Sequence, residues 1–227
     1  MDDLYSRSEI ILGKNAINLI KNSIVMIFGV GGVGSYTVES LARMGVGAIT
    51  VVDGDRFSPS NLNRQLYATT DTVGSYKGEV ARERILSINP DCNVKVFNEF
   101  YNAQSESHFD FSGYDYIVDA TDSPDDKVRL IVNAQKSNVR IISCMGAGNK
   151  LDPTKFRVGD IYSTSVCPLA RLMRSKLKDA GISSLKTVYS TETPIKPEDG
   201  TTVGSVSFVP SVAGLILAGE VIKDLIN

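Results

Sequence analysis

The sequence predicts an α/β fold of the Rossmann-like type, with a mainly parallel central sheet, helices on both faces and a C-terminal extension that completes the domain. Short apolar runs that suit buried strands alternate with segments of helical periodicity. A glycine cluster joins the first of these strands to the helix that follows it. No linker, internal repeat or low-complexity stretch divides the 227 residues. We therefore expect residues 1–227 to form a single domain.

Residues 1–150 contain the regular part of this alternation and are expected to bind the nucleotide. Helical spacing predicts helices over 6–21, 33–44, 76–88 and 125–137, the first with Ile10, Ile11, Ile17 and Ile20 on or near one face. Apolar runs predict strands over 24–28, 48–52, 94–97, 116–119 and 139–143. The polar stretch 54–74 is long for a loop, which points to a functional role.

Residues 151–227 follow a different pattern and are expected to extend the same domain as a substrate-binding part. Strands are predicted within 156–164 and 185–191, around a basic helix over 168–179. Prolines and a glycine predict an exposed, mobile loop over 190–204. The closing helix, 210–226, carries Glu220, Lys223 and Asp224, a spacing that favours a packed amphipathic helix over a membrane anchor.

Composition excludes several classes of protein. The N-terminus is acidic and polar, unlike a secretory signal, and no apolar run is long enough to span a bilayer. The three cysteines, Cys92, Cys144 and Cys167, are too few and too scattered for a disulfide framework or a four-cysteine zinc site. We expect a soluble cytoplasmic protein without membrane contact. The net charge of −2 gives no overall attraction to nucleic acid.

The glycine cluster predicts a phosphate-binding turn. Gly29, Gly31 and Gly34 fit the G-x-G-x-x-G pattern between a strand and a helix, and Gly32 adds a further glycine within it. The helix N-terminus that follows would present free N–H groups to an anion. Asp53 ends the next strand, where a carboxylate can bind ribose hydroxyls.

An NAD-dependent dehydrogenase is the first interpretation of such a turn, and the rest of the sequence weakens it. The general acid–base that such an enzyme needs has one histidine candidate, His108, which lies in a polar segment and is expected at the surface.

The polar residues after Asp53 favour ATP with Mg²⁺ instead. Asp55, Asn61, Arg64 and Lys77 follow it in a dense series that could fix a triphosphate. Asp122 comes just after a strand, at the sheet edge where ligands bind, and a carboxylate there suits Mg²⁺. Each residue also has a structural interpretation, such as a turn former or a helix cap.

Several motifs in this region resemble those of the ubiquitin-activating-like adenylyltransferases of the MoeB and ThiF type. The matching segments, in the family's order, are YSRSEIILG, GVGGVGS, VVDGD, SNLNRQ, VGSYKGE, INP and DATDS. The resemblance implies that a substrate carboxylate attacks the α-phosphorus of ATP to form an acyl-adenylate. It implies ribose binding by Asp53, phosphate binding by Asn61, Arg64 and Lys77, and Mg²⁺ coordination by Asp122. Arg7 matches an arginine that reaches the ATP of a neighbouring protomer, which implies a homodimer.

The expected site residues can then be listed. The residues expected to bind ATP are Gly29, Gly31, Gly32, Gly34, Asp53, Asp55, Asn61, Arg64, Lys77 and Asp122. Those expected to act in catalysis are Arg7, Arg64, Lys77 and Asp122.

Two kinds of substrate remain open within this family. One is the C-terminal Gly-Gly of a ubiquitin-like sulfur-carrier protein, whose activators usually carry a pair of C-x-x-C zinc motifs. This sequence contains no C-x-x-C. The other is a modified tRNA nucleoside, because residues 144–178 and the segments VYSTETP and GSVSFVPSVAGLILAGEVIKDL resemble the tRNA threonylcarbamoyladenosine dehydratase branch.

The second substrate is the preferred interpretation. In that branch the carboxylate of the threonylcarbamoyl group is adenylated, and ring closure then expels AMP. Arg171, Arg174 and Lys178 would share one face of the basic helix and could contact tRNA phosphates. The resemblance leaves a sulfur-relay protein open as a further partner.

Cys167 has two interpretations. It precedes a helix, whose N-terminus would favour a thiolate nucleophile. It could equally be an ordinary small residue at a helix start, and we favour this because ring closure needs no external thiol.

Overall fold

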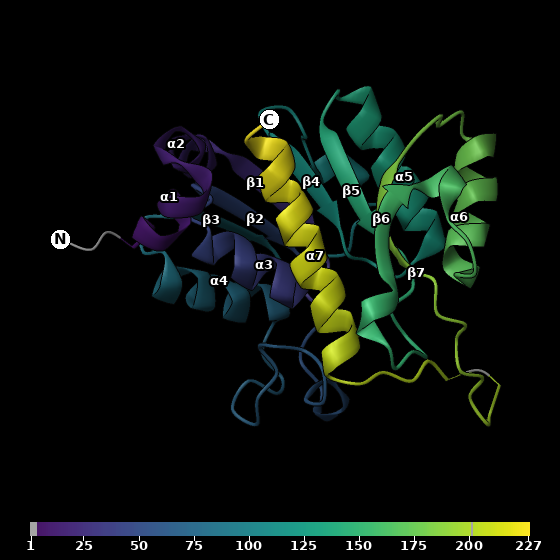
Figure 1. Ribbon diagram of the computed structural model, residues 1–227. Helices are drawn as coiled ribbons and strands as arrows, with labels where there is room; N and C mark the ends of the chain where they lie inside the picture. Colours follow the sequence, from purple (N-terminus) through teal and green to yellow (C-terminus); the bar gives the residue numbers. More distant parts are fainter. Residues whose placement is uncertain (1–3, 201) are drawn as a thin grey trace.

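The computed structural model describes residues 4–200 and 202–227, which form a seven-stranded sheet with helices against both faces (Figure 1). The helices are α1 (Ser6–Leu12), α2 (Lys14–Asn22), α3 (Gly34–Arg43), α4 (Lys77–Ile88), α5 (Pro124–Lys136), α6 (Pro168–Asp179) and α7 (Phe208–Leu225). The strands are β1 (Ile24–Phe28), β2 (Ala48–Val52), β3 (Asn93–Phe97), β4 (Tyr116–Asp119), β5 (Arg140–Cys144), β6 (Phe156–Asp160) and β7 (Lys186–Ser190). Short 3-10 turns occupy Pro59–Asn61, Glu106–His108, Pro153–Lys155 and Ile161–Ser163.

The strands are ordered β3-β2-β1-β4-β5-β7-β6. Every neighbouring pair is parallel except β6 and β7, which confirms the predicted mainly parallel Rossmann-like sheet. From β1 the chain first builds outward through β2 to β3 and then returns to place β4 on the other side of β1. The two directions diverge between β1 and β4, and ligands bind beyond the carboxyl ends of such strands.

Alternating side chains of the central strands belong to two hydrophobic cores, one on each face of the sheet. In β1, Val25 and Ile27 join a core with residues of α2, α3, α4 and α7, whereas Met26 and Phe28 join a second core with residues of α5 and α6. This two-sided burial explains why the central strands are continuous apolar runs in the sequence.

The predicted N-terminal helix over 6–21 is wrong as a single element. Gly13, with φ +83°, separates α1 from α2. Ile17 and Ile20 are buried as expected, but Ile10 and Ile11 in α1 are 79% and 83% exposed. Glycine adopts the left-handed backbone without steric cost, which permits the break.

The C-terminal part adds β6 and β7 to the edge of the same sheet, beside β5. Helix α6 packs against α5, and α7 packs against α3 and lies across one face of the sheet (Figure 1). None of the helices in the described part of the chain is long and apolar enough to cross a membrane.

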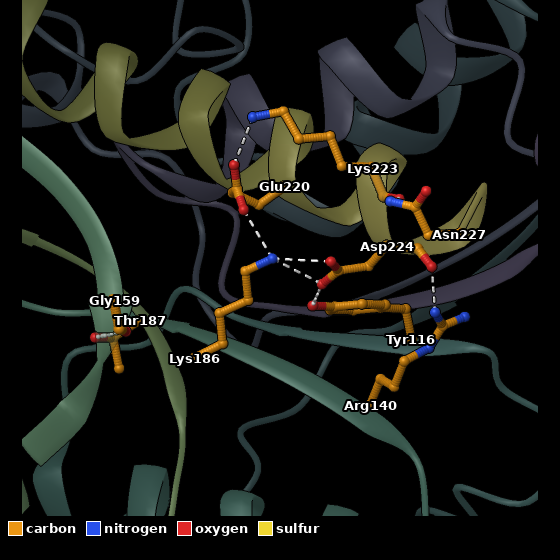
Figure 2. A network of polar contacts seen from close by, with 9 residues as sticks. All are labelled: Tyr116, Arg140, Gly159, Lys186, Thr187, Glu220, Lys223, Asp224 and Asn227. Carbon is orange, nitrogen blue, oxygen red and sulfur yellow. Dashed lines mark hydrogen bonds and ion pairs between the residues drawn. The ribbon is translucent and has the colours of Figure 1, made fainter. Parts of the chain in front are cut away.

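A polar network fastens the end of α7 to the sheet (Figure 2). Lys186 in β7 lies 2.7 Å from Glu220 and 2.9 Å from Asp224, both in α7. The Tyr116 hydroxyl in β4 donates to Asp224 at 2.6 Å, and Arg140 in β5 donates to the main-chain carbonyl of Asp224. These contacts account for the charged residues that interrupt the closing apolar segment.

Candidate active site

A cavity of about 970 Å³ lies at the carboxyl ends of β1, β2, β4 and β5. Nine of the residues expected to bind nucleotide line it: Gly29, Gly31, Gly32, Asp53, Asp55, Asn61, Arg64, Lys77 and Asp122. They come from four separate segments of the chain, and the parallel sheet brings those segments to one edge.

The glycine turn closes tightly between β1 and α3. Gly29 has φ +85°, and a Cβ on it would lie 2.8 Å from the Ala120 carbonyl oxygen. A Cβ on Gly34 would lie only 1.8 Å from the Gly29 carbonyl oxygen, so any side chain there would force the helix away from the strand. Gly34 does not line the cavity and acts in packing, which leaves Gly29, Gly31 and Gly32 at its surface.

Asp53 ties the glycine turn to the end of β2. One carboxylate oxygen accepts the Val30 N–H at 2.7 Å, and the other accepts the Asp55 N–H at 2.8 Å. Burial raises the pKa of Asp53 above its ordinary value, and the positive charge of Lys77 opposes that rise. Each carboxylate oxygen has a second lone pair, so the group can still accept hydrogen bonds from a ligand.

Lys77, at the start of α4, is buried against Asp55. Its ammonium lies 2.8 Å from the Asp55 carboxylate, and the two side chains are 7% and 52% exposed respectively. Asp55 thus supplies the counter-charge of the lysine from the solvent side of the pair. A bound anion could take over that role, because the lysine already faces the cavity.

The polar stretch after β2 is ordered by its own side chains. The Asn61 side-chain oxygen accepts the Ser58 N–H at 3.1 Å, which stabilises the turn at Pro59–Asn61. Arg64 is half-buried and donates to the Ser60 carbonyl at 2.8 Å and to Asn63 at 2.9 Å. These contacts hold Arg64 against the cavity beside Gly32.

The aspartates at the end of β4 are three residues apart and differ in environment. Asp122 is exposed and lines the cavity. Asp119 is fully buried, forms an ion pair of 2.8 Å with Lys127, and accepts from Ser143 at 2.6 Å and from Thr121 at 2.7 Å. Lys127 also donates to the Thr121 carbonyl at 3.1 Å, so the pair fixes the backbone that carries Asp122.

Asp119 and Lys127 are not among the predicted site residues, although both lie in the DATDSPDDK segment. In the sequence, this pair is indicated only by an acidic residue that ends an apolar strand and a lysine in the first turn of the next helix. Because polar residues at these positions are usually solvated, only the tertiary structure reveals the pair.

Arg7 and the basic residues of α6 do not line the cavity of this chain. Arg7 is exposed on α1. Arg171 and Lys178 are exposed on α6, whereas Arg174 is half-buried and donates to the carbonyl and hydroxyl oxygens of Thr164.

Two cysteines form part of the cavity wall. Cys144 ends β5 and Cys167 precedes α6, and their residues are only 3% and 1% exposed. Burial raises the pKa of the Cys144 thiol to about 12. Val166 reaches a φ of +64° just before Cys167, a left-handed conformation that a β-branched residue rarely adopts.

His108 does not itself line the cavity. His108 is exposed, as expected, and its ring lies 2.9 Å from Glu99. Within residues 4–200 and 202–227, no three His, Cys, Asp or Glu side chains are grouped as a metal site.

The comparison with known proteins agrees with the predicted motifs. The model of the ThiF family matches residues 5–227, which is nearly the whole chain. The chain belongs to the ThiF family. This family membership confirms the resemblance on which the site residues were predicted.

Relatives of this ThiF-family chain include tRNA threonylcarbamoyladenosine dehydratases. The enzyme of that name from Bacillus subtilis is 40% identical, over 98% of this chain and 94% of the relative. The one from Escherichia coli is 38% identical, over 83% of this chain and 74% of the relative. A crystal structure of the E. coli dehydratase TcdA in complex with ATP has a TM-score of 0.91 at 33% identity, covering 97% of this chain and 93% of that one.

Proposed function

We propose that this protein is an ATP-dependent tRNA threonylcarbamoyladenosine dehydratase. The observation that carries the proposal is a similarity to such enzymes along almost the full length of both chains, together with a TcdA–ATP complex of nearly the same fold. The cavity that gathers the predicted nucleotide-binding residues supports it, because adenylation requires ATP at this edge of the sheet.

In the proposed site, ATP lies with its ribose at Asp53 and its phosphates over Gly29–Gly32. The N-terminus of α3 and the side chains of Asn61, Arg64 and Lys77 would stabilise the phosphate charge. When ATP binds, its phosphate would share Lys77 with Asp55, which now holds the ammonium at 2.8 Å.

The residues present suit Mg²⁺. Asp122 is exposed at the cavity, and Mg²⁺ binds through one or two carboxylates together with phosphate oxygens and water. The ion would be held by Asp122 and would neutralise phosphate charge during adenylation.

The proposed reaction has two steps. An oxygen of the substrate carboxylate attacks the α-phosphorus, the bond to the β-phosphate oxygen breaks, and pyrophosphate leaves. The carbamoyl group then attacks the activated acyl carbon, and AMP leaves with the oxygen that it gained from the carboxylate. The net change in the nucleoside is the loss of one water. Positioning and charge neutralisation account for such steps, so no strong general base is required.

We further propose that the active unit is a homodimer in the cytoplasm. Arg7 lies on α1, away from this chain's own cavity, and the neighbouring Ile10 and Ile11 are exposed apolar side chains of the kind that subunit contacts cover. Arg7 would then reach the ATP of the partner subunit. A sulfur-relay protein remains a proposed additional partner.

The proposed tRNA surface is α6. Arg171 and Lys178 are exposed there and could bind backbone phosphates, with Arg174 held between them by Thr164.

The decisive experiment is mass analysis of tRNA nucleosides after incubation with the protein, ATP and Mg²⁺. We expect threonylcarbamoyladenosine to lose one water, with AMP and pyrophosphate released in equal amounts. Release of pyrophosphate triggered instead by a protein with a C-terminal Gly-Gly would support the sulfur-carrier alternative and contradict this proposal. Hydride transfer from NADH would revive the dehydrogenase interpretation.

A further inference from the structure

A buried lysine that lines the cavity after β5 has no acidic partner among the residues that the structure describes. Lys150 follows β5, lines the cavity and is only 4% exposed. Its ammonium donates to the Gly146 carbonyl at 2.9 Å and to the Gly148 carbonyl at 3.2 Å. An ammonium can donate three hydrogen bonds, so two carbonyls leave one donor for a ligand.

The other buried lysines in the described part of the chain each have a carboxylate. Lys77 lies 2.8 Å from Asp55, and Lys127 lies 2.8 Å from Asp119. None of the ion pairs found among the described residues includes Lys150, whose ammonium contacts two main-chain carbonyls instead. Buried charges are normally paired, because the loss of hydration is costly in a low-dielectric environment. An anion that enters the cavity would therefore be stabilised by forming an ion pair with Lys150.

The strand order indicates which anion Lys150 would bind. Asp53, the proposed ribose ligand, follows β2, on one side of β1. Lys150 follows β5, which lies two strands away on the other side of β1, beyond β4 and the Asp122 loop. The ATP phosphates, proposed to lie between Asp53 and Lys150, already have Arg64 and Lys77 as cationic partners. The remaining anion that the proposed reaction needs is the carboxylate of the second substrate.

We infer that Lys150 binds the carboxylate of the substrate and selects for nucleosides that carry one. This inference rests on the proposed function. One carboxylate oxygen would accept the free ammonium proton, and the other would stay available for attack on the α-phosphorus. The hydrogen bonds to the Gly146 and Gly148 carbonyls fix the ammonium before the substrate arrives, so little side-chain conformational entropy is lost on binding. Lys150 thereby determines specificity, because an uncharged analogue would leave its charge unpaired.

The test compares Lys150→Gln with wild type and with Lys136→Gln, an exposed lysine at the end of α5 that does not line the cavity. Glutamine keeps the ability to donate to the two carbonyls but removes the charge. Three quantities are measured: the affinity for ATP, kcat/KM for modified tRNA, and the ratio of affinities for tRNA with and without the threonylcarbamoyl group.

For Lys150→Gln we expect kcat/KM for modified tRNA to fall about tenfold or more, since a charge-assisted hydrogen bond is lost. The preference for modified over unmodified tRNA should also disappear, while the ATP affinity stays within about twofold, because the nucleotide contacts are unchanged. Lys136→Gln should match wild type in all three measurements. Should Lys150→Gln fail to fold, Lys150→Arg replaces it, and this variant is expected to keep the preference because it keeps the charge.

Three outcomes would overturn the inference. A Lys150→Gln protein with an intact preference for modified tRNA would show that Lys150 only shapes the turn. A parallel loss of ATP affinity would assign Lys150 to the nucleotide phosphates. Loss of the preference in a folded Lys150→Arg protein would show that charge is not what matters. Wild-type protein that leaves modified tRNA unchanged would instead contradict the proposed function itself.

Discussion

At the scale of single residues, two aspartates at the end of β4 lie in different environments. Asp119 is fully buried and has Lys127, Ser143 and Thr121 as partners, whereas Asp122 is exposed at the cavity without a hydrogen bond among the described residues. A buried carboxylate that is fully paired cannot serve a ligand without losing those contacts. The two positions therefore predict different consequences of substitution.

Replacing Asp122 should greatly reduce turnover and leave the fold intact. Asp122→Ala removes the proposed Mg²⁺ ligand from an exposed loop, so we expect kcat to fall about 10²-fold or more, as for loss of a group that stabilises transition-state charge. The midpoint of thermal unfolding should stay within about 2 °C of wild type, because exposed substitutions rarely change stability by more than about 0.5 kcal/mol. Full activity in this variant would remove Asp122 from the mechanism.

Replacing Lys127 should instead damage the fold. Lys127→Met leaves Asp119 as an unpaired buried carboxylate, which typically costs about 3–5 kcal/mol in the free energy of unfolding. Urea denaturation measures this loss. The double variant Asp119→Asn, Lys127→Met should recover part of it, since the uncompensated charge is gone. A single variant as stable as wild type would show that the ion pair does not hold the loop.

At the scale of elements, the helices and strands that were predicted best are those whose boundaries are set by local sequence signals. Strands 24–28, 48–52 and 116–119 and the helix over 168–179 agree with β1, β2, β4 and α6 at both ends. Their boundaries lie where apolar runs or helical periodicity meet glycine, proline or charge. The break at Gly13 was missed, because a glycine within a helical pattern is tolerated unless tertiary contacts pull the two halves apart.

The attachment of α7 to the sheet should weaken in acid. Burial by itself would raise the pKa of Asp224, but hydrogen bonds from Tyr116 and Lys186 outweigh it and lower this pKa below the ordinary 3.8. The pKa of Glu220 is lowered in the same way, with Lys186 and Lys223 outweighing its burial. A carboxyl whose pKa is lower in the folded state stabilises the fold above its unfolded pKa, and this stabilisation is lost as the pH falls through the folded pKa.

Asp224→Asn tests this contribution. It should reduce the free energy of unfolding by about 1–3 kcal/mol at pH 7, because it weakens charge-assisted hydrogen bonds to Lys186 and Tyr116. The difference from wild type should shrink as the pH drops below the ordinary range for aspartate. Lys223→Gln is the matched control, since its pair with Glu220 is exposed on the lysine side and should contribute less than about 1 kcal/mol. A difference between wild type and Asp224→Asn that is independent of pH would contradict the assignment.

At the scale of the whole molecule, the convergence of the site was predictable and its buried partners were not. Gly29, Asp53 and Asp122 each follow a strand, and parallel strands bring their carboxyl ends to one edge, so the sequence pattern alone indicates a common site. The counter-charges of Lys77 and Lys127, and the lack of one for Lys150 among residues 4–200 and 202–227, depend on which loops meet in three dimensions. No local pattern records that information.

The proposed homodimer predicts complementation between two inactive variants. Arg7→Ala removes the residue proposed to act on the partner's ATP, and Asp122→Ala disables the protomer's own site. In a mixed dimer the Arg7→Ala protomer keeps an intact cavity and receives Arg7 from its Asp122→Ala partner. Since equal amounts of the two chains give half mixed dimers with one working site each, activity should recover to roughly one quarter of wild type. Each variant alone should be about 10²-fold or more below wild type, as expected for loss of an arginine finger or a Mg²⁺ ligand. The mixture is unfolded and refolded together, and pyrophosphate release is measured with modified tRNA. If Arg7 acted within its own protomer, every chain in the mixture would carry a disabled site, and no activity would return.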